Sequence, residues 1–91
     1  MARVFQTYNI NEANIIAHIT PVKGKADLCA MLMPSRGMAY GDERWYVTKN
    51  RGEASKIVYF GSQGQASLKV YFVKSLGDAG WQTQHRLKGM L

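Results

Sequence analysis

Short apolar segments alternate with polar turns along the whole chain. The clearest segment is 68–73, Leu-Lys-Val-Tyr-Phe-Val, which contains no Gly or Pro. Every second residue from Leu68 lies on one face, the period of a half-buried strand. The same reading predicts strands over 3–6, 15–20, 28–33, 45–48, 57–60 and 68–73.

The two faces of these segments differ in composition. One face of 15–20 and 28–33 places small Ala17 and Ala30 between larger apolar residues, as interlocking core layers require. At one equivalent position the other face carries a mostly aromatic set, which indicates partial burial: His18, Met31, Tyr46, Tyr59 and Tyr71.

The turns between the segments repeat. Alanine recurs from Ala13 at intervals of 13, 13, 15, 12 and 13 residues, and two positions before each alanine stands Gly or, once, Asn11. These structural turn residues are Gly24, Gly37, Gly52, Gly64 and Gly77, followed by Ala26, Ala39, Ala54, Ala66 and Ala79. Gly and Asn tolerate positive φ best, so we predict a left-handed residue in each turn and a crowded site at each alanine. The chain is therefore a repeat protein.

The repeat also sets the domain organisation. The longest interval contains two extra residues around 41–44, which predicts a bulge or longer loop before Trp45. After Trp81 the repeat ends, so we expect a repeated domain over 1–81 and a C-terminal tail over 82–91. Periodicity alone predicts one all-β domain of six or seven short strands, a small solenoid or barrel.

Several of these phrases resemble a known family. They are Ala26-Asp27-Leu28, Ala-Ser-Leu-Lys-Val-Tyr-Phe at 66–72, Asp42-x-x-Trp45 and Ala79-Gly80-Trp81. Together they are similar to the small bacterial 7(1) septoil knot domain, and the likeness covers roughly 3–81. The resemblance implies a knotted all-β backbone, against the general rule that chains avoid knots, and it implies no established activity. Several family repeats carry Asp after the alanine, where this chain has Tyr40, Ser55, Ser67 and Gly80.

The charge and the cysteine content indicate which partners and which cellular compartment suit the protein. Twelve Lys and Arg against six Asp and Glu give a net charge of +6, which favours polyanionic or acidic partners. The single Cys29 excludes an internal disulfide and fits a reducing compartment. No apolar run approaches the length of a membrane span, and the start lacks the pattern of a secretion signal. We expect a cytoplasmic protein.

Residues for catalysis or metal binding are few. His18 occupies the position of the ring tyrosines, and His85 lies in the tail. The acids Asp42 and Glu43 lie in the inserted loop beside a neutralising Arg44. The Cys, His and Asp residues show no metal-ligand spacing. We expect no cofactor, no metal and no catalysis.

Basic residues fall in or beside the repeated turns. If the turns share an edge, they form a basic rim flanked by Tyr46, Tyr59 and Tyr71, a combination that can neutralise phosphates and stack bases. The cations are Lys23, Lys25, Arg36, Lys49, Arg51 and Lys74. Simple solvation of the turns is the competing reading, because Glu12, Glu53 and Asp78 occupy turns too.

Three functional hypotheses follow. The leading one is a non-catalytic structural or protein-interaction module that forms a homo-oligomer, a dimer in the simplest case, through exposed residues such as Met31, Met33 and Tyr40. The second is a weak, sequence-tolerant nucleic-acid binder that uses the basic rim. The third is a small hydrolase, which requires His18 or Asp42 in a pocket.

Overall fold

The computed structural model of the chain describes residues 2–91, and these residues contain seven β-strands and no α-helix. The strands are β1 (Ala2–Gln6), β2 (Ile15–Ile19), β3 (Leu28–Leu32), β4 (Arg44–Val47), β5 (Lys56–Phe60), β6 (Leu68–Phe72) and β7 (Gly80–Trp81). Five one-turn 3-10 helices occupy turns: η1 (Ile10–Glu12), η2 (Lys23–Lys25), η3 (Arg36–Met38), η4 (Arg51–Glu53) and η5 (Leu76–Asp78). The six predicted strands are confirmed, each end within one residue.

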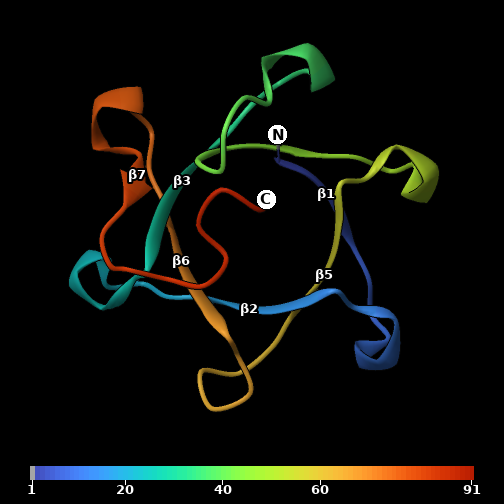
Figure 1. Cartoon of the computed structure of the whole chain (residues 1–91), viewed down its shortest axis with the longest axis horizontal. Helices are drawn as coiled ribbons and strands as arrows, with labels where there is room; N and C mark the ends of the chain where they lie inside the picture. The colour runs from blue at the N-terminus through green and yellow to red at the C-terminus, as the bar shows by residue number, and fades with distance from the viewer. Residues whose placement is uncertain (1) are drawn as a thin grey trace.

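Six of the strands form a closed barrel in which every neighbouring pair is parallel. Around the barrel the order is β4-β1-β5-β2-β6-β3, and the pairing of β3 with β4 closes it. The short β7 lies antiparallel to β3. Figure 1 shows the strands as the sides of a ring and the turns as outward corners. The expectation of an all-β domain with six or seven strands is confirmed.

Each barrel strand divides its length between two neighbours. In β1, Ala2 to Val4 pair with β4, and Val4 to Gln6 pair with β5. The strand β2 does the same, with Ala17 as the residue shared by its ladders to β5 and β6. The residues shared by two ladders are all buried, with exposed fractions of 2 % or less: Val4, Ala17, Trp45, Val58 and Val70. The middle of each strand therefore faces the barrel axis, and its ends diverge towards the corners.

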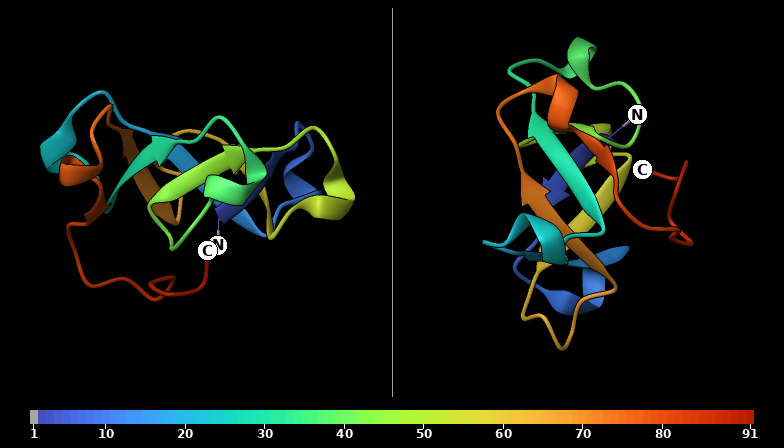
Figure 2. Two further views of the ribbon diagram at one scale, coloured as in Figure 1. Left: turned by 90° about the horizontal axis from the view of Figure 1, so that it is seen from above. Right: turned by 90° about the vertical axis from the view of Figure 1, so that its left-hand side faces the viewer.

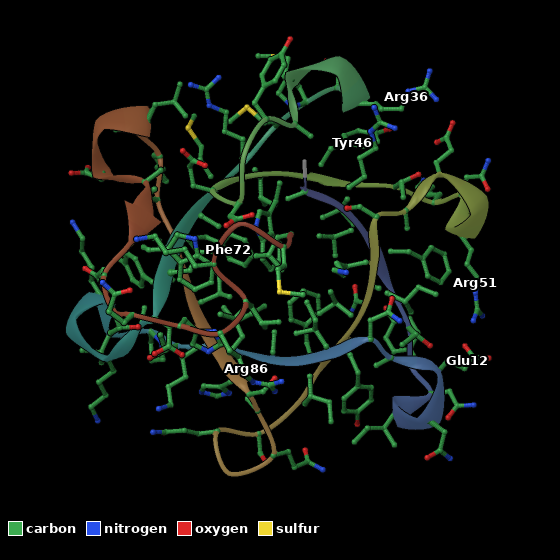
Figure 3. All side chains as sticks on the ribbon, viewed as in Figure 1. Glu12, Arg36, Tyr46, Arg51, Phe72 and Arg86 are labelled. Carbon is green, nitrogen blue, oxygen red and sulfur yellow. The ribbon has the colours of Figure 1, made fainter. Side chains whose placement is uncertain are left out.

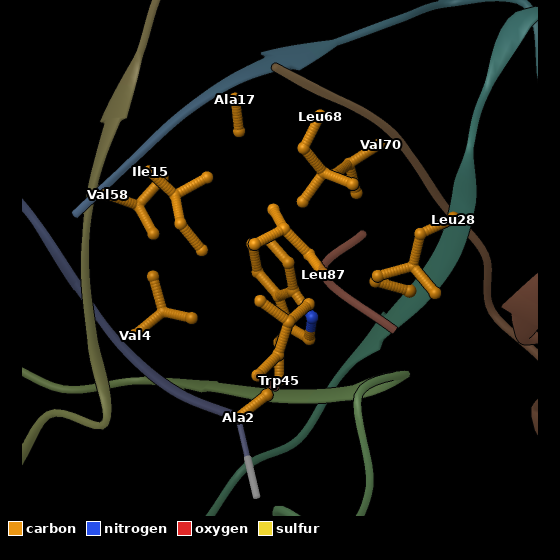
Figure 4. Close-up of a cluster of buried hydrophobic side chains, with 12 residues drawn as sticks. Ala2, Val4, Ile15, Ala17, Leu28, Trp45, Val58, Leu68, Val70 and Leu87 are labelled. Carbon is orange, nitrogen blue, oxygen red and sulfur yellow. The ribbon is translucent and has the colours of Figure 1, made fainter. Parts of the chain in front are cut away.

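One cluster of side chains fills the barrel (Figure 4). Trp45 is the largest buried side chain, and Ala2, Ala17 and Ala30 in the same cluster have no exposed area. Small residues leave room for the indole in an interior close-packed like an organic crystal. The predicted role of Ala17 and Ala30 in the core is confirmed.

In four of the six repeats, the residue after the repeated alanine holds a neighbouring strand with its backbone and its side chain. The N–H of Asn14 donates to the Ile57 carbonyl (2.8 Å), and its Oδ1 accepts from the Ile57 N–H (2.8 Å). Asp27 grips Lys69 in the same two-point way. At Ser55 and Ser67 a hydroxyl takes the place of the carboxylate or amide and contacts the backbone of Arg3 and Ile16. These side chains extend the ladders by one polar contact at the start of β2, β3, β5 and β6.

The prediction that the turn glycines adopt a left-handed conformation is wrong. The glycines with positive φ are Gly41, Gly80 and Gly89, and none of Gly24, Gly37, Gly52, Gly64 and Gly77 is among them. Most of these turns are right-handed 3-10 helices. In three of the five 3-10 helices, the side chain of the residue that precedes the helix accepts a hydrogen bond from a backbone N–H of its first turn; these capping residues are Asn9, Asn50 and Ser75. A Cβ at Gly24, Gly37 or Gly64 would meet nothing within 4 Å, so no contact requires glycine there.

The longer interval before Trp45 is a turn at Gly41, whose φ of 62° confirms the predicted extra loop. Crowding at the repeated alanines is found at Ala26 and Ala39, which are buried, whereas Ala54, Ala66 and Ala79 are half-buried. Over residues 2–91, none of the helical turns has the length and apolarity that a membrane crossing needs.

Two glycine substitutions test this account of the turns. Gly64→Ala should leave stability unchanged or raise it by about 0.4–1 kcal/mol, because the site is open and alanine restricts the unfolded chain. Gly80→Ala should cost about 1–3 kcal/mol, because φ there is 138°. Urea unfolding of both variants measures the difference. Equal loss at the two sites would restore the left-handed interpretation of Gly64.

Candidate interaction surfaces

The acid Asp42 is a structural anchor for the tail. Its side chain is buried and accepts hydrogen bonds from Trp81 Nε1 (2.8 Å), from the Leu91 N–H (3.0 Å) and from the Gly89 N–H. Residues 82–91 cross one open end of the barrel, as Figures 1 and 2 show, and Leu87 and Leu91 join the core cluster. Asp42 thereby fixes residues 82–91 over the end of the barrel.

The two histidines also have structural partners, and the cysteine is buried. Nδ1 of His18 donates to the Gly61 carbonyl (3.0 Å). His85 stacks on Trp81, its Nε2 donates to the Ser67 carbonyl (2.7 Å), and its Nδ1 accepts from the Leu87 N–H (3.1 Å). Cys29 is buried within β3, and burial raises the pKa of its thiol. Within residues 2–91, no three His, Cys, Asp or Glu side chains gather closely enough to hold a metal ion.

The predicted basic residues lie at corners spread around the ring rather than along one edge. Three of the six cations bind an acid of an adjacent corner: Arg36 with Glu53 (2.6 Å), Arg51 with Glu12 (3.0 Å) and Lys23 with Asp78 (3.8 Å). Figure 3 shows Arg51 and Glu12 between η4 and η1, and Arg36 pointing towards η4. Among residues 2–91, Lys25, Lys49 and Lys74 therefore have no ion-pair partner.

A surface hollow, which we call the η1–η4 notch, lies where β1 and β4 diverge towards η1 and η4. Its volume is about 620 Å³. Two predicted cations, Lys49 and Arg51, border an apolar lining of Phe5, Tyr8 and Val47. The remaining lining is polar: Gln6, Thr7, Glu12 and Thr48.

A second, smaller hollow of about 260 Å³ brings together Lys23, Lys74 and Tyr71 with Asp78. Of the remaining predicted rim residues, Lys25, Arg36, Tyr46 and Tyr59 line neither hollow. The three tyrosines of the rim are half-buried on the outer face of β4, β5 and β6. The structure thus places five of the nine predicted rim residues in two separate hollows and leaves the other four outside both.

Exposed apolar side chains gather on the η3 corner, which we define as Leu32, Met38 and Tyr40. Their exposed fractions are 51 %, 45 % and 61 %. An adjoining hollow of about 360 Å³ is lined by Met31, Leu32, Phe72, Val73 and Lys74. The expected exposure is confirmed for Tyr40, but Met31 is half-buried and Met33 is buried, with 8 % of its surface exposed.

Sequence reasoning missed Tyr8, whose 86 % exposure is the highest among the large apolar side chains of residues 2–91. A signal was present in the pattern Thr-x-Asn-x-x-Glu, which occurs at 7–12 and again at 48–53. In both copies the Thr hydroxyl donates to the Glu carboxylate, at 3.1 Å from Thr7 to Glu12 and 3.2 Å from Thr48 to Glu53. The two copies build the two walls of the η1–η4 notch.

Comparison with known proteins supports the resemblance to the family named in the sequence analysis. The model of the 7(1) septoil knot domain matches residues 1–82. No curated protein and no solved structure matches the chain.

Removal of Asp42 should release the tail. In Asp42→Ala the three donors lose their acceptor, but only the Leu91 N–H is buried, whereas Gly89 is exposed to water. A buried donor without a partner costs about 1–3 kcal/mol, so we expect a loss of about that size in urea unfolding, with the amides of Gly89 and Leu91 losing protection in hydrogen exchange first. Glu43→Ala, which removes the neighbouring acid, is the control. Equal effects of the two substitutions would contradict the anchor role.

Proposed function

The chain belongs to the 7(1) septoil knot domain family, a family of knotted domains of unknown function, and we propose that it is a non-catalytic protein-interaction module that associates with itself. The residues considered for catalysis support this proposal because the side chain of each is engaged in hydrogen bonds within the chain. Asp42 binds three donors of the tail and β7, and His18 bonds the Gly61 carbonyl. Neither residue lines one of the three hollows described above.

The η3 corner carries the proposal of self-association. Three apolar side chains, Leu32, Met38 and Tyr40, are about half exposed or more within nine positions of one another. The 360 Å³ hollow beside Leu32 offers a recess for such a side chain from a second copy. A two-fold contact would place the same surface against itself, so both copies would bury the same residues.

Charge favours an apolar rather than an ionic contact between copies. Glu12, Glu53 and Asp78 already pair with cations of the same chain, and Asp27 and Asp42 bind backbone groups. Little acidic surface is left to meet the cations of another copy, and the net charge of +6 repels it. Association should therefore be weak at low ionic strength and stronger when salt screens the repulsion.

Sedimentation equilibrium over a concentration series tests self-association. Leu32→Asp should weaken it about tenfold or more, because a charge placed in an apolar contact must be desolvated. The matched control is Tyr8→Asp, which introduces the same charge on a more exposed aromatic position at another corner. A monomer at every concentration, or equal weakening by both substitutions, would contradict the proposal.

Nucleic-acid binding is the second candidate, favoured by exposed cations without an ion pair. They are Lys25, Lys49, Lys74, Arg86 and Lys88. These cations can meet phosphates, which position a strand without specifying its sequence. The ion pairs of Arg36, Arg51 and Lys23 oppose this function, since each must be broken or shared before its cation engages a phosphate.

The salt dependence of the affinity distinguishes binding through the three rim cations that have no ion pair from binding through all six. Engagement of Lys25, Lys49 and Lys74 alone predicts a slope of about −2 for log affinity against log salt, whereas all six predict about −4. Titration of a fluorescent single-stranded oligonucleotide at several salt concentrations measures the slope. The control is the double variant Lys49→Ala with Arg51→Ala, which should reduce the slope. Affinity that is indifferent to this substitution would end the basic-rim hypothesis.

A further inference from the structure

We propose that the η1–η4 notch binds an extended acidic segment of a partner protein by adding it as a strand beside β1. The proposal shares with the function proposed above only the assignment of an interaction module. It uses a different surface, on another part of the ring. Its basis is the backbone edge, the lining and the charge of the notch.

The backbone edge is open in the notch. The ladder between β1 and β4 ends at Val4 opposite Val47, whereas β1 continues through Phe5 and Gln6 with β5 as its partner. The Thr7 N–H donates to Val58 of β5 (2.9 Å), so strand alternation turns the backbone of Gln6 towards the β4 side. No strand of the barrel pairs with that side of Gln6. An unpaired edge of this kind is the template for strand addition.

The lining suits alternate side chains of an extended segment. Phe5 and Val47 offer apolar area on the two diverging strands, and Tyr8 stands almost fully exposed at the mouth. In strand addition, main-chain hydrogen bonds supply affinity and the pockets for alternate side chains supply specificity. A peptide with an apolar residue at every second position matches this arrangement.

Charge selects an acidic partner. Glu12 is held by both Thr7 and Arg51, at 3.1 and 3.0 Å, so the carboxylate in the notch is already neutralised. Within the described part of the chain Lys49 has no ion-pair partner, so its charge in the lining is available to a ligand. Carboxylates of the partner can pair with Lys49. The phosphates of a nucleic acid could meet Lys49 as well, but a nucleic acid has no amide edge to pair with Gln6.

Fluorescence anisotropy with a defined probe tests the proposal. The probe is a fluorescein-labelled heptapeptide, Glu-Val-Glu-Phe-Glu-Val-Glu, and a second version carries N-methyl groups on alternate amides to block strand pairing. We expect saturable binding of the first peptide and a loss of about tenfold or more with the second. Lys49→Glu should weaken binding of the first peptide by about tenfold or more, and Lys25→Glu, at another corner, should change it much less.

Amide chemical shifts locate the site and show that each variant is folded. Addition of the peptide should move the resonances of residues 5–8 and 47–49. Shifts confined to other corners, equal binding of the N-methylated peptide, or indifference to Lys49→Glu would each overturn the proposal. Competition by a single-stranded oligothymidylate at the same residues would overturn it in favour of nucleic acid.

The same samples separate this proposal from self-association. Tyr40→Asp, on the η3 corner, should reduce association between copies and leave binding of the peptide intact. If the peptide fails to bind while wild-type protein still associates, the notch proposal is wrong and self-association stands. If the peptide binds a protein that is monomeric throughout, self-association is wrong and the notch proposal stands.

Discussion

Every barrel strand pairs with two different neighbours through two halves of its length, and the rest of the structure depends on this sharing. The residue common to both halves must face the barrel axis, which is why Val4, Ala17, Val58 and Val70 are buried. Beyond that residue the two neighbours diverge, so each strand ends in an outward corner. A change of the central side chain therefore disturbs two ladders and the core together.

The same divergence creates the surfaces on which function can be built. Where two strands separate, a hollow opens between corners, and three such hollows are lined by apolar residues and cations. The corners are joined in places by exposed ion pairs, such as Arg51 with Glu12. These pairs contribute little to stability, but they decide which cations remain free for a partner. Pairing within the chain thus shapes the charge that a partner meets.

Polar residues that invite a chemical interpretation serve the architecture. Asp42 and His85 hold the tail across the open end of the barrel, where Leu87 and Leu91 complete the core. Neighbouring strands are held at the same position of four of the six repeats, by Asn14, Asp27, Ser55 and Ser67. A carboxylate, an amide and a hydroxyl can all make this contact, which explains why Ser replaces Asp without loss of the fold.

The sequence by itself determined the strands, the repeat and the alternation of buried and outer faces, because these follow from local periodicity. It did not determine the turn conformation, since Gly marks either a left-handed residue or an open 3-10 turn and only the surrounding backbone distinguishes them. Tertiary structure alone decided that the predicted cations occupy different corners, that three of them are neutralised, and that Tyr8 joins Lys49 in one notch. These outcomes depend on which distant strands pair, as β1 with β4 does across some forty residues, and local pattern carries no information about that choice.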